Sequence, residues 1–174
     1  MLPPFKYHPD PIATGAVKPS EAECECCGQT RGFTYAPNIY AEEEIEDICP
    51  WCVADGSAAD KFDGTFSDDY PLTVAELSSE IVDEVTRKTP GFISWQQEEW
   101  QICCNDACEF HGDASREDVK GLSLEAFHAA FGDSSLSADF VGSLKENYGP
   151  GGDPAIYKWR CRHCGQYKFN ADFS

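Results

Sequence analysis

Ten cysteines are the residues of this 174-residue chain whose type and spacing could do chemistry. Four of them form two Cys-x-x-Cys pairs, with 21 residues between the pairs: Cys24 with Cys27, and Cys49 with Cys52. A Cys-x-x-Cys turn can aim both sulfurs at one point, and two such turns complete a tetrahedron. The spacing therefore predicts a structural zinc site with four cysteine ligands.

Neighbouring residues support this site and leave alternatives open. Gly28 follows Cys27 and permits the positive φ that such a turn often needs. Cys26 is expected to be a spare thiol, because its use as a ligand would shorten the first pair to Cys-x-Cys. Two other interpretations are four buried thiols without metal, and a thiol–disulfide pair in the Cys-Pro-Trp-Cys segment at 49–52.

A second group of cysteines lies in the C-terminal half. Cys104 and Cys108 are separated by three residues, and Cys161 and Cys164 by two, with Gly165 next. These four predict a second zinc site, with the intervening 52 residues as an insertion. Such a separation is no obstacle, because the entropy of closing a loop grows slowly with its length. Three residues compete as ligands, and the spacing does not decide between them: Cys103, His111 and His163.

Charge limits the partners that the chain can bind. The formal net charge is −18, with only 13 Lys and Arg, which disfavours a nucleic-acid partner and favours basic proteins. One local exception combines basic and aromatic residues over 157–169. We expect this segment to pack against the chain's own acidic surface. Its basic members are Lys158, Arg160, Arg162 and Lys168.

The compartment decides how cysteine pairs are interpreted. The N-terminal residues lack the basic and apolar regions of a signal peptide, and no stretch approaches the ~18 apolar residues that span a bilayer. We therefore expect a cytoplasmic protein without membrane insertion. In a reducing cytoplasm, paired cysteines bind metal more often than they form disulfides.

The remaining sequence predicts an α+β fold with zinc-ribbon or treble-clef-like cysteine knuckles, short antiparallel strands and about three helices. A capping-box pattern at Thr73 and Glu76 begins a helix that extends to Val85. Further helices are predicted over 123–131 and 137–147. A strand is predicted over 32–36, and a hairpin over 156–169 has a cysteine pair at its tip. Five prolines in residues 1–20 predict an extended lead-in.

These elements divide the chain into two expected regions that form one compact unit. Residues 1–70 make the N-terminal zinc-knuckle region. Residues 71–174 make a helical and β-hairpin region that carries the predicted second site.

Four blocks of sequence resemble one known family. They are the opening 5–11, the Cys-Pro-Trp-Cys block 48–59, the stretch 89–96 and the block 100–108. Together they are similar to the CbrC family of bacterial proteins associated with colicin tolerance, formerly grouped as an uncharacterised family. The resemblance spans nearly the whole chain and implies a bacterial cytosolic protein. It implies no reaction.

The function predicted is therefore a structural zinc-binding protein that acts as a protein-interaction module, with a link to colicin tolerance implied by the resemblance. The alternatives are a metal- or thiol-dependent enzyme and a nucleic-acid-binding zinc protein. No His-Glu-x-x-His motif, phosphate loop or serine elbow is present, so no catalytic residue is predicted. The protein partner and the oligomeric state are not specified by the sequence.

Overall fold

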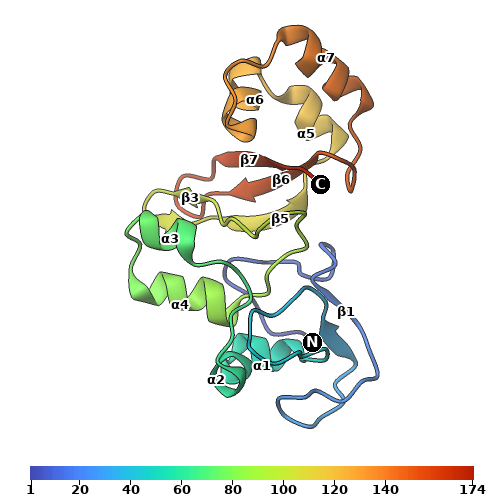
Figure 1. Ribbon diagram of the computed structural model, residues 1–174, viewed down its shortest axis with the longest axis vertical. Helices are drawn as coiled ribbons and strands as arrows, with labels where there is room; N and C mark the ends of the chain where they lie inside the picture. The colour runs from blue at the N-terminus through green and yellow to red at the C-terminus, as the bar shows by residue number, and fades with distance from the viewer.

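The computed structural model describes residues 1–174 and is elongated, with three layers stacked along its long axis (Figure 1). One end holds strands β1 (Val17–Pro19) and β2 (Phe33–Tyr35) with helices α1 (Pro50–Ala54) and α2 (Ser57–Phe62). The two strands are antiparallel and pair Val17 with Tyr35. Pro50 begins α1, where its missing N–H costs no helical hydrogen bond. This layer has its own core, which includes Ile48, Val53 and Phe66.

The middle layer contains a three-stranded antiparallel sheet in the order β5-β6-β7. The strands are β5 (Glu109–Asp113), β6 (Ala155–Arg160) and β7 (Tyr167–Asp172). A short hairpin of β3 (Ile102–Cys103) and β4 (Asp106–Ala107) precedes the sheet, after helices α3 (Tyr70–Val74) and α4 (Ser79–Lys88). The largest core of the molecule lies here, and aromatic rings dominate it: Phe92, Trp100, Phe110, Tyr157 and Trp159.

The proline-rich N-terminal segment belongs to this middle core. The Tyr7 hydroxyl donates to Asp106 Oδ1 at 2.6 Å, and the Phe110 N–H donates to the Tyr7 carbonyl at 2.8 Å. His8 is fully buried and bonds the Pro90 carbonyl through Nδ1 at 2.8 Å. The segment is extended, as expected, but it lines the core instead of leading up to it.

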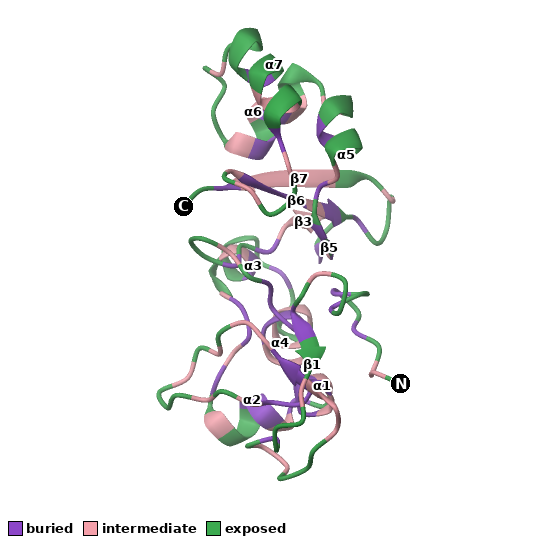
Figure 2. Ribbon diagram, turned by 90° about the vertical axis from the view of Figure 1, so that its right-hand side faces the viewer, coloured by how far each residue is buried: buried purple, intermediate pink, exposed green.

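The third layer is the insertion between β5 and β6. Helices α5 (Arg116–Gly121), α6 (Leu124–Phe131) and α7 (Ala138–Asn147) cover the face of the sheet away from α4 (Figure 1). A serine side chain caps the start of each helix by accepting a backbone N–H. Their outer surfaces are exposed, and the buried residues face inward (Figure 2). The small core beneath them includes Val119, Phe127, Val141, Tyr148 and Ile156.

The prediction of about three helices was wrong, because the chain has seven. Helices α6 and α7 and the β6–β7 hairpin lie where the sequence predicted them. The helix predicted from Thr73 to Val85 is instead two helices, because Glu76 has a left-handed backbone with φ +56°. Two helices of only five and six residues were missed, α1 and α5. Such short helices contain too few turns for an apolar repeat to show.

No helix of the structure is long and apolar enough to cross a membrane. The longest helices, α4 and α7, have ten residues each.

Candidate metal centres

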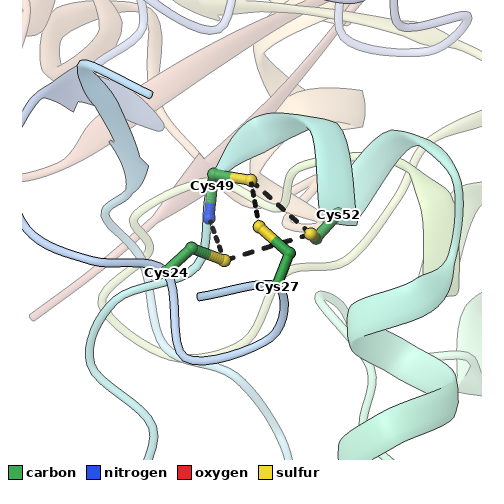
Figure 3. Close-up of side chains that lie close together, drawn as sticks. All are labelled: Cys24, Cys27, Cys49 and Cys52. Carbon is green, nitrogen blue, oxygen red and sulfur yellow. Dashed lines mark hydrogen bonds between the residues drawn. The ribbon is translucent and has the colours of Figure 1, made fainter. Parts of the chain in front are cut away.

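The sulfur atoms of Cys24, Cys27, Cys49 and Cys52 converge at the end of the molecule that holds α1 (Figure 3). All four lie within 4.8 Å of one another. The Cys24–Cys52 and Cys27–Cys49 separations are 3.9 Å, and the Cys49–Cys52 separation is 3.5 Å. The structure therefore brings together the four residues of the first predicted site.

These separations match a metal site better than a disulfide. A tetrahedron with Zn–S bonds of about 2.3 Å has S···S edges of about 3.8 Å. Disulfide sulfurs would be about 2.05 Å apart. Four sulfurs at tetrahedral spacing can hold one metal ion at their centre.

Two local structures aim the sulfurs. The first is the turn that begins at Cys24, in which the Gly28 N–H donates to the Cys24 carbonyl at 2.7 Å and the Cys24 N–H donates to the Gln29 carbonyl at 3.1 Å. Gly28 has φ +66°, which favours glycine. The second is the start of α1, where Cys49 is the N-cap and Cys52 lies in the first turn.

The surroundings of this tetrad stabilise one of its cysteines as a thiolate. A cation is needed to stabilise the others as thiolates. Burial opposes ionisation of Cys24, but donors led by the Cys49 N–H, 3.2 Å away, outweigh burial and lower its pKa. Burial raises the pKa of both Cys49 and Cys52, and the Cys24 thiolate raises them further. A divalent ion at the centre would stabilise all four as thiolates.

A second group of four sulfurs lies where the β3–β4 hairpin meets the β6–β7 hairpin. Its members are Cys103, Cys104, Cys161 and Cys164, again within 4.8 Å of one another. Cys103 lies 3.9 Å from Cys104 and 3.8 Å from Cys164. These distances also fit the edge of a tetrahedral metal site. Cys104 and Cys164 are exposed, whereas three members of the first tetrad are buried.

The two tetrads share one structural unit. The sequence Cys-x-x-Cys-Gly-Gln occurs at 24–29 and again at 161–166. In the second copy, the Cys161 N–H donates to the Gln166 carbonyl at 2.8 Å, and the Gly165 N–H donates to the Cys161 carbonyl at 3.1 Å. The same two bonds close the first copy. The pKa of Cys161 is lowered to about 6, mainly because the backbone N–H of Cys164 donates to its sulfur. Cys24 also has a lowered pKa, so the first cysteine of each copy is the one most readily ionised to a thiolate.

The other half of the second tetrad is a tight turn. Cys103 pairs with Asp106 across the β3–β4 hairpin, and Cys104 and Asn105 are the two turn residues. Both have left-handed backbones, with φ +53° and +57°. Two successive left-handed residues make the type I′ turn that joins tightly paired strands. This turn presents two adjacent cysteines to the Cys161 knuckle.

Cys108 does not join the second tetrad, which corrects the predicted ligand set. Its side chain is fully buried in the aromatic core, where its carbonyl accepts the Trp100 indole N–H at 2.8 Å. Burial raises the pKa of its thiol to about 12. Cys103 and Cys104 occupy the places that the spacing assigned to Cys104 and Cys108.

The histidines that competed as ligands have other partners. His163 Nε2 lies 2.9 Å from Asp106 Oδ2, and His111 Nε2 lies 3.3 Å from Glu109 Oε2. Asp106 also accepts from Tyr7, so it fixes the knuckle to the N-terminal segment. Cys26 lies outside the first tetrad, with its sulfur 3.6 Å from Ser57 Oγ.

The basic segment of the β6–β7 hairpin is paired within the chain. Lys158 binds Asp118 at 2.8 Å on one face of the sheet. The other basic side chains contact Glu109, Asp106 or a backbone carbonyl; they are Arg160, Arg162 and Lys168. Trp159, in the middle of the segment, is fully buried. This arrangement leaves few free cations for phosphate groups.

Comparison with known proteins places this chain in a family. The model of an uncharacterised protein family, UPF0167, matches residues 2–173. The chain belongs to the UPF0167 family. A UPF0167 protein of Pseudomonas aeruginosa is 47% identical over 175 residues, which cover 99% of this chain and 98% of the relative. The match includes both tetrads within its span.

Two mycobacterial members extend the comparison. UPF0167 proteins of Mycobacterium bovis and Mycobacterium tuberculosis are each 40% identical over 176 residues, covering 99% of this chain and 94% of each relative. No solved structure matches the chain significantly. The family description names no reaction, so the functional argument depends on the geometry of the two tetrads.

Proposed function

We propose that this UPF0167 protein is a structural zinc-binding protein that acts as a protein-interaction module. The observation that supports it best is the convergence of eight cysteine sulfurs into two groups with near-tetrahedral spacing. The ligands proposed are Cys24, Cys27, Cys49 and Cys52 for the first Zn²⁺, and Cys103, Cys104, Cys161 and Cys164 for the second.

Each ion would connect segments that are distant in sequence. The first joins the turn after β1 to the start of α1, and the second joins the β3–β4 turn to the tip of the β6–β7 hairpin. A structural zinc ion contributes on the order of 10 kcal/mol of apparent binding energy to folding. Sites closed by four protein ligands leave no position for a reacting water, so their role is to hold the fold.

Exposed aromatic residues and high negative charge support the interaction role. Tyr70 and Trp95 are 68% and 57% exposed, and the net charge is −18. Trp51 is partly covered, with the Arg31 guanidinium 5.4 Å from its ring centroid. A basic protein is the partner that this surface favours.

We further propose that the protein is cytoplasmic. We also propose that its cysteine knuckles are of the zinc-ribbon or treble-clef type and that the chain has two regions, 1–70 and 71–174. A link to colicin tolerance follows only from the resemblance to the CbrC family. Zinc itself is a proposal, because iron also accepts four thiolates in tetrahedral geometry.

The thiol-enzyme alternative has weaker support. A nucleophilic cysteine is usually accessible and has a lowered pKa. Cys49, which would be the attacking residue of the Cys-Pro-Trp-Cys segment, is buried and has a raised pKa because of that burial. Its sulfur also lies within 3.9 Å of two other tetrad sulfurs, as a metal ligand would.

Elemental analysis of the full chain tests the metal proposal. Protein purified with a reductant and without chelator should contain two zinc ions per chain. Cys52→Ser should retain one, whereas the control Cys26→Ser should retain two, because Cys26 lies outside the tetrad. Iron in place of zinc would correct the metal, and the absence of any bound transition metal would overturn the proposal.

Affinity capture tests the interaction role. The zinc-loaded chain should retain a bacterial protein reproducibly at low salt and release it at high salt, because acidic surfaces are screened by ions. Cys52→Ser should capture less of the same protein. A chain that retains no protein reproducibly at low salt would contradict the interaction role while leaving the metal sites intact.

A further inference from the structure

A cavity separate from both tetrads lies between the N-terminal segment, the end of β5 and the start of β6. Its volume is about 330 Å³, which is within the usual range of small-molecule sites. Five segments of the chain line it: Thr14, the stretch Phe92–Trp95, the β5 residues Phe110, Gly112 and Asp113, the turn Gly151–Gly152, and Ala155 with Tyr157. No metal ligand is among the lining residues.

Aromatic rings form one side of this cavity and are rigidly held. Phe92 and Phe110 stack with ring centroids 4.2 Å apart, and Phe92 meets Tyr157 edge-on at 5.1 Å. The Tyr157 hydroxyl lies 3.1 Å from the Ile93 carbonyl and 3.2 Å from Asp172 Oδ2. These bonds fix the ring without using its face. The backbone N–H of Trp95 donates to the same Asp172 carboxylate, and the Trp95 side chain lies at the exposed rim of the cavity.

Asp113 is the charged group of the cavity, and it has no cationic partner. The ion pairs of the structure include its neighbours Glu109 and Asp118 but not Asp113. Partial desolvation raises the pKa of its carboxyl, and a hydrogen bond from the Gly151 N–H offsets this effect only in part. A bound cation would compensate its negative charge.

An adjoining cavity extends the negative surface. It has a volume of about 440 Å³ and shares Thr14, Phe110, Gly112 and Asp113 with the first, so the two form one groove. The second part adds Asp10 and His111, and neither part is lined by a lysine or an arginine. Two carboxylates without a lysine or arginine beside them make the groove a poor site for anions.

Glycines keep the groove open at its narrowest side. Gly112, which lines both parts, has φ +79°. A Cβ there would come within 3.1 Å of the Thr14 side chain. Gly151 and Gly152 form the facing turn without side chains. Asp113 and Trp95 are exposed at this groove, whereas Phe92 and Tyr157 are 2% and 5% exposed and contribute only a small part of their surface to its lining.

We propose that this groove binds an organic ammonium group, with Asp113 as its counter-ion and the rings of Phe92, Tyr157 and Trp95 around its apolar part. Cations are attracted to aromatic faces and to carboxylates, and quaternary ammonium groups are recognised by both. The ammonium can belong to a small free amine or to a lysine side chain of a basic protein. The proposal does not depend on the identity of the metal.

Calorimetric titration of the full, metal-loaded chain tests the proposal with choline and its neutral isostere, 3,3-dimethyl-1-butanol. Choline should bind saturably, and the isostere at least about tenfold more weakly, because it lacks the charge. Asp113→Asn should weaken choline binding about tenfold. The matched control is Asp139→Asn, which removes an exposed carboxylate on α7 and should bind like the wild type.

A second arm of the titration distinguishes the two sources of the ammonium. A capped peptide with one lysine should bind more tightly than choline if the natural ligand is a protein, and more weakly if it is a small amine. Failure of both probes to saturate at about 10 mM would overturn the proposal, as would equal binding of the isostere or of Asp113→Asn. Metal content and circular dichroism, measured on the same samples, show separately whether the zinc proposal holds.

Discussion

The sulfurs of Cys103 and Cys164 lie 3.8 Å apart, although 61 positions separate these residues in the chain. The contact forms because a two-residue turn at Cys104 and Asn105 reverses the chain directly after Cys103. The same turn sends Cys108 into the aromatic core. The hairpin therefore determines which cysteines lie beside Cys164, and their proposed role as metal ligands can be tested by comparing Cys103 with Cys108.

We predict that Cys103→Ala lowers the metal content from two ions per chain to one, whereas Cys108→Ala leaves it at two. Cys108→Ala should instead lower the free energy of unfolding by about 1 kcal/mol, because it removes one buried atom from a packed core. Elemental analysis and urea unfolding measure the two effects. Loss of metal from Cys108→Ala, together with full metal content in Cys103→Ala, would instead support Cys108 as the ligand, as the sequence spacing predicted.

The shared Cys-x-x-Cys-Gly-Gln unit predicts a specific backbone effect. Gly165 has φ +71°, and a Cβ added there would meet no heavy atom within 4 Å, so Gly165→Ala strains the backbone without a clash. We expect it to lower the free energy of unfolding by about 1 kcal/mol. The control is Gly142→Ala inside α7, where the space is also open but φ is helical.

Gly142→Ala should stabilise the protein by up to about 1 kcal/mol, because alanine is the better helix former. Urea unfolding of the two variants under identical metal loading gives the comparison. Equal effects of the same sign at both glycines would show that the Gly165 turn is not constrained as described.

Asp118 connects the helical layer to the sheet. Its carboxylate bonds the Ser115 backbone and side chain in a capping box and also binds Lys158 of β6 at 2.8 Å. We predict that Asp118→Ala lowers the free energy of unfolding by about 1–2 kcal/mol through loss of the cap and the ion pair. Asp139→Ala, in the first turn of α7 without an ion-pair partner, should cost about 0.5 kcal/mol or less.

Chemical unfolding with a probe in the helical layer measures this effect. Hydrogen exchange of the Tyr148 amide suits the purpose, because this N–H donates to the Leu144 carbonyl at the end of α7 and the Tyr148 hydroxyl bonds the Ala114 carbonyl in the core beneath these helices. Equal stability of the two aspartate variants would contradict a connecting role for Asp118.

His8 predicts a pH dependence. The Pro90 carbonyl can only accept, so Nδ1 carries the proton and Nε2 accepts from the Thr14 hydroxyl at 2.6 Å. Burial lowers the pKa of His8 to about 4, from 6.5. Between pH 6.5 and 4 the unfolded chain therefore binds a proton that the folded chain does not. The free energy of unfolding should fall across that window by up to about 3 kcal/mol.

Comparison with His8→Asn isolates this contribution, because asparagine can still donate to Pro90 but does not titrate. The wild type should lose stability more steeply than His8→Asn as the pH falls from 6.5 to 4, and the two slopes should agree above pH 6.5. Effects of acid on the cysteine sites are common to both chains. Parallel curves across the whole range would show that His8 takes up its proton in the folded state.

Short-range sequence patterns, such as helix caps and paired cysteine spacings, correctly predicted the features that depend on only a few neighbouring residues. Ser123 and Gly132 correctly bound α6, and the paired spacing at 24–27 and 49–52 identified four residues that do converge. Each of these features is decided within a few residues of itself. The prediction of the first tetrad needed only that two rigid turns meet.

Features decided by distant contacts were missed. Cys103 and Cys108 differ in whether they face the knuckle or the aromatic core, and spacing carries no information about that choice. The break at Glu76 lets Leu72 enter the core from α3 and Leu77 from the connection between α3 and α4, whereas the predicted repeat was one uninterrupted helix. The ammonium groove is formed by five segments and has no sequence motif.

The burial of Tyr7 and His8 has a consequence for synthesis of the chain. Their partners Asp106 and Pro90 are 99 and 82 positions downstream, so Tyr7 and His8 cannot acquire their final surroundings until those residues have been synthesised. Contacts of such long sequence separation form slowly. The segment around Tyr7 and His8 therefore remains without its core contacts while the following half of the chain is made.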